Sequence, residues 1–322
     1  MRTAGLGSLP GTDLGAGVRL GLEATSIPWL PEFPARGPWA GMIGRSLGLL
    51  DGLGAELSAG QWRFGAAVGL DQRRARAALR DDLDVLEENA QGLTGPLKVS
   101  VAGPWTLASA TLLSRGGRVL GDAVARRDLA QALASGVADL RTGIERRLPG
   151  ASVLLQVDEP SLPAVLAGSV PTEGGYFRHR SVDRPEAAEL LAGLGGDVLH
   201  CCAPGLDVTL VLGGDGAGFT GVALDQDLMT PATWDALAPL IEDGAELWLG
   251  CAPTASGIAP SADALTARVL GVLRPLELGP VLTERVVLTP ACGLAGWAAP
   301  EVSRVFAALR TTTARIEEEL LS

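Results

Sequence analysis

The sequence predicts an α/β protein, folded as a single (β/α)8 TIM barrel that spans residues 1–322. Short apolar runs of strand length alternate with longer segments of helical periodicity, and this alternation is typical of parallel βα units. About eight such pairs follow one another, which is the number that a closed barrel needs. The 322 residues, of which 47% are hydrophobic, supply a large core, and barrels of this length commonly form one domain. No repeat or change in composition marks a domain boundary.

In the first half of the chain, each predicted element has its own local signal. Thr12 or Asp13 is placed to cap a first helix, and prolines make the segment after that helix an extended loop. The strongest helix has apolar residues at helical spacing with charges on the opposite face. In chain order, the expected elements are a strand at residues 5–9, a helix at 14–24, the loop at 28–38, a helix at 42–53, a second strand at 54–57, the strong helix at 71–89, a strand at 97–102 and a helix at 122–147.

The second half of the chain continues the alternation, and its strands end in polar or cysteine-containing segments. A run rich in β-branched and apolar residues leads into Asp158-Glu159-Pro160. In chain order, the expected elements are a strand at residues 152–157, a loop at 178–184, a helix at 185–194, and strands near Val198 and at 221–224, 247–249 and 286–288, with helices between them.

Composition excludes several classes of function. The net charge of −11 repels phosphate backbones and anionic membranes, so we expect no nucleic-acid or membrane partner. The N-terminal residues show no apolar signal core, and no apolar run approaches the ~18 residues of a membrane span. We therefore expect a cytoplasmic protein. In that compartment, four cysteines in a long chain are more often ligands, nucleophiles or buried apolar groups than disulfides.

The cysteines stand where predicted strands end, and one of the two histidines stands with them. His200 and Cys202 follow one strand, Cys251 another, and Cys292 the last. The carboxyl ends of barrel strands meet at one face, where active sites lie. His200 and Cys202 are two positions apart, so both side chains can face one ion. Imidazole with thiolates is a donor set that zinc prefers. The pattern therefore predicts a zinc site at His200, Cys202 and Cys292.

A fourth ligand is needed, and the sequence leaves its identity open. Asp225 ends the intervening strand and is the first candidate, with Cys251 as its rival. The competing interpretation is that these cysteines are buried apolar residues, which is their usual role. Their placement at converging strand ends favours the metal site.

Two further strand ends suit a substrate with an amino-acid group. Asp158 and Glu159 precede a rigid proline and suit an ammonium group, unless Asp158 only caps a helix. Backbone N–H groups at Gly7-Ser8 and at 103–106 suit a carboxylate, although glycine turns are common in barrels. His179, between two arginines, is expected to be a loop residue.

At these positions the chain resembles the cobalamin-independent methionine synthases, specifically their C-terminal catalytic barrel in its short archaeal and actinobacterial form. The resemblance covers nearly the whole chain. The matching motifs are Gly7-Ser8-Leu9-Pro10, Gly103-Pro104-Trp105-Thr106, Gln156-Val157-Asp158-Glu159-Pro160, His200-x-Cys202 and Pro290-x-Cys292-Gly293-Leu294. Each motif is short, but their order and spacing together are specific.

The resemblance implies a zinc-dependent methyltransferase that converts homocysteine to methionine. Zn²⁺ would be bound by His200, Cys202, Cys292 and, where the family has a glutamate, Asp225. The amino-acid end of homocysteine would be held by Leu6, Gly7, Ser8 and Asp158. Zinc would deprotonate the thiol, and the thiolate is the competent nucleophile.

Two departures from the family pattern concern the methyl donor. Cys251 stands where the family has a proton-donating histidine, and Ala164 stands where it has a glutamate that contacts folate. A folate donor needs its departing nitrogen protonated, whereas a methyl–cobalt donor does not. We therefore expect a methylcorrinoid, free or protein-bound, with Cys251 at the catalytic position. Two alternatives stay open: a zinc methyltransferase for another thiol, and a non-catalytic zinc- or amino-acid-binding relative.

Overall fold

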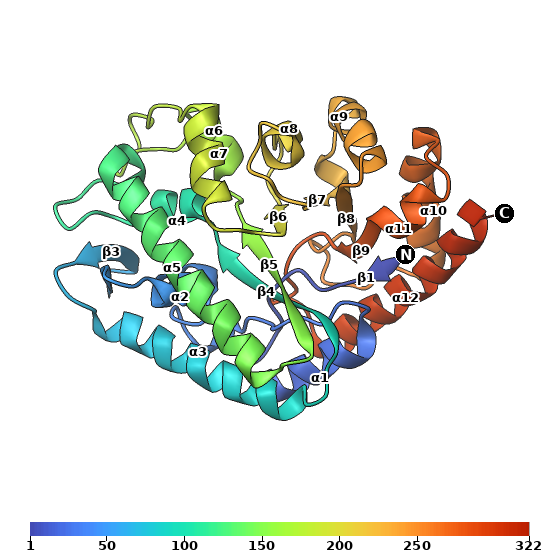
Figure 1. Ribbon diagram of the computed structural model, residues 1–322, viewed down its shortest axis with the longest axis horizontal. Helices are drawn as coiled ribbons and strands as arrows, with labels where there is room; N and C mark the ends of the chain where they lie inside the picture. The colour runs from blue at the N-terminus through green and yellow to red at the C-terminus, as the bar shows by residue number, and fades with distance from the viewer. Residues whose placement is uncertain (322) are drawn as a thin grey trace.

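The computed structural model describes residues 1–321, and its centre is a curled sheet of seven parallel strands (Figure 1). The sheet order is β1-β9-β8-β7-β6-β5-β4, so each strand from β4 to β9 pairs with the next along the chain, and β1 pairs with β9. The α/β barrel expected from the sequence is confirmed. The strands are β1 (Arg2–Thr3), β4 (Gly95–Ala102), β5 (Ala151–Asp158), β6 (Val198–Cys201), β7 (Gly221–Asp225), β8 (Glu246–Ala252) and β9 (Val286–Pro290).

Residues 27–30 close the barrel between β1 and β4. Ile27 N–H donates to the carbonyl of Thr3, while Lys98 N–H of β4 donates to the carbonyl of Pro28. Leu30 N–H donates in turn to the carbonyl of Lys98. This segment therefore occupies the position of the second barrel strand. Pro28 within it has no N–H to donate to a regular ladder, which is why the sequence predicts a loop here.

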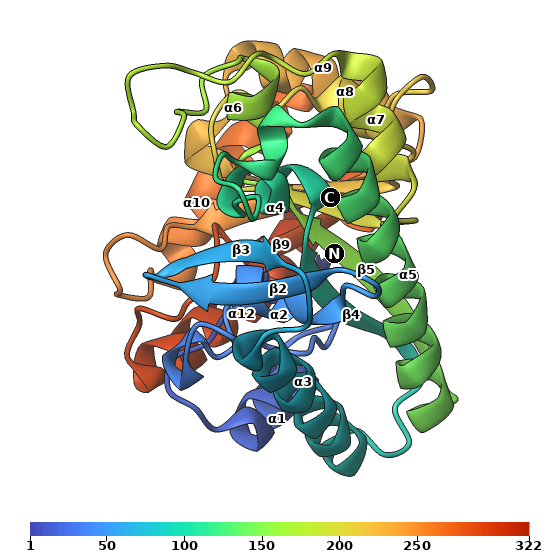
Figure 2. The same cartoon turned by 90° about the vertical axis from the view of Figure 1, so that its left-hand side faces the viewer.

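The predicted second strand at residues 54–57 is wrong as a barrel strand. That segment is β2 (Gly54–Ser58), which pairs antiparallel with β3 (Gln61–Gly65) in a hairpin outside the barrel. Figure 2 shows this hairpin in front of the barrel, below the loop that follows α6. The first strand also differs from its expected place at residues 5–9, since regular pairing covers Arg2–Thr3 and continues only as isolated bridges at Ala4 and Ser8.

Helices cover the outside of the sheet, with α3, α5 and α12 as the longest (Figure 1). Asp13 caps the first helix by accepting from Ala16 N–H at 2.9 Å, and Asp122 caps α5 in the same way. The helices are α1 (Leu14–Ala24), α2 (Met42–Leu49), α3 (Leu70–Asn89), α4 (Pro104–Ala110), α5 (Ala123–Arg147), α6 (Leu162–Leu166), α7 (Arg184–Ala192), α8 (Val208–Leu212), α9 (Pro231–Glu242), α10 (Ala262–Leu273), α11 (Val281–Arg285) and α12 (Ala299–Leu321).

The strand alternation separates two apolar clusters. The larger cluster lies between the strands and the helices, while a smaller one fills the barrel interior around Trp248, which is fully buried. The interior cluster consists of Ala4, Leu6, Ile27, Val198, Ala223, Trp248 and Val287. Within residues 1–321, no helix combines the length and the apolar character needed to cross a membrane.

Candidate metal and substrate site

Three of the predicted metal ligands converge at the carboxyl ends of two strands that are not neighbours. His200 lies in β6, Cys202 directly follows it, and Cys292 follows β9. One ligand atom from each residue, the imidazole nitrogen and the two Sγ atoms, lies within 4.8 Å of the others. Because β7 and β8 separate β6 from β9 in the sheet, the group spans the mouth of the barrel. The structure therefore brings together residues that are about 90 positions apart along the chain.

The imidazole of His200 is oriented for metal binding. Its Nδ1 lies 3.1 Å from the carbonyl oxygen of Ala223, which fixes the proton on Nδ1. Its Nε2 is buried and has no hydrogen-bond partner among the described residues. A ligating histidine has this arrangement, with one nitrogen donating to a carbonyl and the other presenting its lone pair. One nitrogen with two sulfurs, open at a fourth position, fits a catalytic zinc ion.

The thiols of Cys202 and Cys292 shift the pKa of each other. A hydrogen bond from Cys292 stabilises the thiolate of Cys202 and lowers the pKa of Cys202. The same bond, together with burial, raises the pKa of Cys292 to about 12. One of the two sulfurs is therefore already favoured as a thiolate, the form that binds zinc.

The two candidates for the fourth ligand lie outside this group. Asp225 ends β7, and its Oδ1 accepts from the N–H of Asp227 at 2.9 Å. The charge of His200 acts on the Asp225 carboxyl, which places the two groups in the same region, and burial raises the Asp225 pKa. Cys251 lies on the helix side of β8 with Leu247 and Leu249.

Burial leaves Cys251 little reactivity. Its side chain is fully buried, its Sγ lies 3.7 Å from the carbonyl oxygen of Thr289, and burial raises its pKa to about 12. The structure does not bring it to the cluster, so the catalytic position expected for it has no counterpart here. A register shift in the pairing of β8 with β9, between Gly250 and Ala252, lies at this residue. The alternation of inward and outward side chains is least predictable at such a bulge.

Asp158 lies beside the cluster and faces the barrel interior. It pairs in register with His200 across β5 and β6. Its side chain is 6% exposed, and its Oδ1 accepts a hydrogen bond from Gln156 Nε2 at 2.6 Å. Burial raises its pKa, while the neighbouring charges of His200 and Lys98 lower it. A buried carboxylate beside a candidate metal site is suited to bind a cationic group of a substrate.

The segment from Leu6 to Ser8 adjoins the same region. The carbonyl oxygen of Leu6 accepts from Gln156 Nε2 at 2.6 Å, and that of Ser8 accepts from Leu294 N–H at 2.7 Å. A Cβ added at Gly293 would lie 2.2 Å from the Oγ of Ser8, so a larger residue after Cys292 would require Ser8 to move. The predicted substrate segment is therefore packed directly against the chain that carries the third metal ligand.

Glu159 turns away from this site and holds the start of α4. Its carboxylate accepts from the N–H groups of Trp105 and Thr106, both at 2.8 Å, and from the hydroxyl of Thr106 at 2.6 Å. Two expectations are corrected here. The N–H groups of Trp105 and Thr106 already donate to a carboxylate of the protein, so they are not available to a substrate carboxylate. The capping role considered for Asp158 belongs to Glu159, because adjacent strand residues point to opposite faces.

Replacing Glu159 with Ala is expected to lower the free energy of unfolding by about 3–5 kcal/mol, because three buried donors lose their acceptor. Urea unfolding followed by tryptophan fluorescence measures this change. Glu189, on the exposed side of α7, is the matched control, and its replacement by Ala is expected to change stability by less than about 0.5 kcal/mol. Equal losses in the two variants would contradict the buried role of Glu159.

Three buried charged residues around Asp158 were not predicted from the sequence. Glu32 lies just after residues 27–30, which close the barrel, and its Oε1 is buried without a partner among the described residues. Lys98 lies inside β4, and Arg45 of α2 donates to the carbonyl of Pro31. Burial raises the pKa of Glu32 to about 7 and lowers that of Lys98 to about 7. A lysine within an apolar strand was the one signal that could have identified this group.

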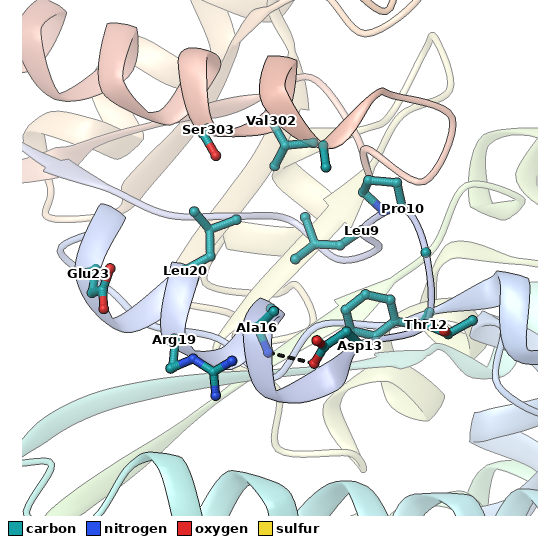
Figure 3. Close-up of a pocket in the computed structure, with 14 residues that line it drawn as sticks. Leu9, Pro10, Thr12, Asp13, Ala16, Arg19, Leu20, Glu23, Val302 and Ser303 are labelled. Atoms are coloured by element: carbon teal, nitrogen blue, oxygen red, sulfur yellow. Dashed lines mark hydrogen bonds between the residues drawn. The ribbon is translucent and has the colours of Figure 1, made fainter.

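A cavity of about 450 Å³ lies outside the barrel between α1 and α12 (Figure 3). Leu9, Leu20 and Val302 supply its apolar walls, and the carboxylate of Asp13 at its edge is already bonded to Ala16 N–H. None of the predicted ligands or substrate residues lines it. This cavity is therefore separate from the metal and substrate site.

Residues 91–315 match the family model described as the catalytic domain of the cobalamin-independent synthases. The chain belongs to this family. The matched segment contains Asp158 and the three clustered ligands, whereas Leu6 to Ser8 precede it. The resemblance expected from the sequence is thereby confirmed, and the chain is a methyltransferase domain of the methionine synthase type.

Solved structures support the fold of this synthase domain. It matches the B12-independent methionine synthase from Shewanella sp. W3-18-1, solved in complex with selenomethionine, at 13% identity over 99% of this chain and 98% of that one, with a TM-score of 0.61. It also matches a methyltransferase from Methanosarcina mazei at 15% identity over 94% and 85% of the two chains, with a TM-score of 0.56. No curated protein matches the sequence.

Proposed function

We propose that this domain, as one catalytic unit over residues 1–322, is a zinc-dependent S-methyltransferase that converts homocysteine to methionine. The observation that carries the proposal is the pairing of Asp158 with His200 in adjacent strands, beside the cluster of one imidazole and two thiols. The cluster suits a thiol, and the buried carboxylate suits an ammonium group. Homocysteine carries both groups on one short chain. The selenomethionine bound by the Shewanella enzyme is an analogue of the product.

Separate groups of residues bind the thiol end and the amino-acid end of the substrate. Zinc would be held by Nε2 of His200, the Sγ atoms of Cys202 and Cys292, and a carboxylate oxygen of Asp225. When bound, zinc lowers the pKa of a coordinated thiol and so supplies a thiolate at neutral pH. Asp158 accepts the substrate ammonium group, and the backbone of residues 6–8 borders its carboxylate. Exclusion of water by these buried groups strengthens the interactions with the substrate.

We propose a methylcorrinoid as the methyl donor. Departure of a folate nitrogen needs an acid within hydrogen-bond reach. Cys251, which stands where the family has its acid, lies on the helix side of β8. Its thiol pKa is raised to about 12 by burial, so it is a poor proton donor as well as a distant one. Transfer from cobalt leaves a group that needs no proton.

Replacing Asp225 with Ala is expected to weaken zinc retention about 10- to 100-fold, whereas replacing Cys251 with Ala leaves it close to wild type. Of these two residues, Asp225 is the one whose carboxyl interacts with the charge of His200. Competition with a chromogenic chelator measures zinc affinity in both variants. A greater loss in the Cys251 variant would transfer the ligand role to that residue.

A comparison of several thiols tests which of them is the substrate. The zinc-loaded full chain is incubated with methylcobalamin and with homocysteine, cysteine or 2-mercaptoethanol, and each methylated product is measured by mass spectrometry. The proposal expects methionine as the dominant product. Preference for a thiol without an amino group would indicate a methyltransferase for another thiol. Zinc and methionine binding without any turnover would indicate a non-catalytic relative.

A further inference from the structure

Lys98 is the centre of a hydrogen-bond network in the barrel interior. It lies in β4, and its side chain has no solvent exposure. Its Nζ donates to Gln156 Oε1 at 2.7 Å, to Ser100 Oγ at 3.0 Å and to the carbonyl oxygen of Leu6 at 3.2 Å. A buried lysine is rare unless such partners surround it. The network joins β4, β5 and the N-terminal segment.

The ammonium group of Lys98 favours one orientation of the amide of Gln156. An ammonium group only donates hydrogen bonds, so the carbonyl end of the amide must face Lys98. The NH2 end then faces the other way, where it donates to Asp158 Oδ1 and to the carbonyl oxygen of Leu6, each at 2.6 Å. Lys98 and the two acceptors at the other end of the amide favour the same orientation. The reversed amide would present its NH2 group to an ammonium group and its oxygen to two other oxygens.

The charges around Lys98 favour its ammonium form. The nearby acids are Asp158 and Glu32, and the other buried base is Arg45. Burial lowers the pKa of Lys98 to about 7, and the two carboxylates act in the opposite direction. In its ammonium form, Lys98 balances the charge of Asp158 inside the barrel, where an unpaired carboxylate would be costly.

We propose that Lys98 is a positioning residue for the substrate ammonium site, acting through Gln156 on Asp158 and on the carbonyl of Leu6. The proposal rests on the function proposed above. Lys98 does not itself contact the substrate. It fixes the amide that holds one oxygen of Asp158 and the carbonyl oxygen of the substrate segment, so the Oδ2 of Asp158 stays aimed at the substrate. Loss of Lys98 should weaken recognition of the amino group and spare recognition of the thiol.

The test compares two ligands that differ only in the amino group. Dissociation constants of L-methionine and of 4-(methylthio)butanoate are measured by calorimetry on the zinc-loaded full chain. The variants are Lys98→Met, which keeps an unbranched side chain but removes the ammonium group, and Gln156→Met, which removes the amide and keeps Lys98. Gln72→Met is the matched control. Gln72 is also fully buried with three hydrogen bonds, but it lies in α3 and bonds the backbone of residues 47, 53 and 55, outside the Lys98 network.

We expect Lys98→Met and Gln156→Met to weaken methionine binding roughly 10- to 100-fold and to leave the affinity for 4-(methylthio)butanoate nearly unchanged. In kinetic assays, the KM for homocysteine should rise more than kcat falls. Gln72→Met should retain the wild-type ratio of the two affinities, even if its stability decreases. The same loss in the two site variants would place Lys98 and Gln156 in one chain of contacts.

Two results would overturn the inference, and they are distinguishable. If wild-type protein does not prefer methionine to 4-(methylthio)butanoate, both the proposed function and this inference fail. If the wild type shows the preference and the site variants keep it, the inference alone fails. Should Lys98→Met not fold, Gln156→Met tests the step through which Lys98 acts on Asp158, and a wild-type preference in that variant would overturn the inference.

Discussion

Replacing Cys202 with Ala is expected to weaken zinc binding more than about 100-fold and to abolish methyl transfer to homocysteine. Cys202 supplies one of two sulfurs in the cluster, and its thiolate is already favoured by the hydrogen bond from Cys292. Without it, His200, Cys292 and the proposed carboxylate of Asp225 remain, with a single sulfur, and a tetrahedral site lacks one protein ligand. Zinc per chain after gel filtration and methionine formation from methylcobalamin measure the two effects.

The neighbouring residue Cys201 provides the matched control. Its side chain is buried on the helix side of β6, and burial raises its thiol pKa to about 12. Cys201→Ala should therefore keep its zinc and its activity and lose only about 1 kcal/mol of stability from the small cavity. Equal zinc losses in the two variants would mean that the cluster depends on local packing rather than on ligation by Cys202.

The methyl donor gives the second large effect. With zinc-loaded wild-type protein and homocysteine, we expect methionine from methylcobalamin and at least about 100-fold less from methyltetrahydrofolate, because a positioned acid contributes roughly that factor and none is present at Cys251. Both donors are assayed in parallel at the same homocysteine concentration, with zinc-free protein as the control.

Brisk turnover with methyltetrahydrofolate would contradict this assignment of the donor. It would require another proton source, and His179 would be the first residue to replace. His179 lies in the loop after α6, 4.0 Å from a carboxylate oxygen of Glu173. Loss of folate-dependent turnover in His179→Ala, with methylcobalamin turnover retained, would then identify it as the acid.

Regular patterns in the sequence predicted much of the fold. The helix at residues 14–24 and its Asp13 cap agree with the structure, because local capping chemistry defines that boundary. The second barrel strand was missed because its pairing consists of a few bridges around Pro28, with no run of alternating residues. The hairpin β2–β3 was taken for that strand, because propensity does not reveal which partner a strand pairs with.

The site shows the same division between local and long-range information. The spacing of His200 and Cys202 sufficed to place both at one end of the barrel, because strand alternation is local. The opposite roles of Asp158 and Glu159 were not accessible, since both are carboxylates and only tertiary contacts assign Glu159 to α4. Lys98 was missed because its partners lie on other strands.

X-ray absorption at the zinc edge, with and without homocysteine, tests the central claim most directly. We expect two sulfur ligands at ~2.3 Å in the zinc-loaded protein and a third when homocysteine is added, because the substrate thiol joins the four protein ligands or displaces the carboxylate of Asp225. In Cys201→Ala the same increase should appear. A sulfur count that stays at two with homocysteine bound would contradict thiol activation at this cluster.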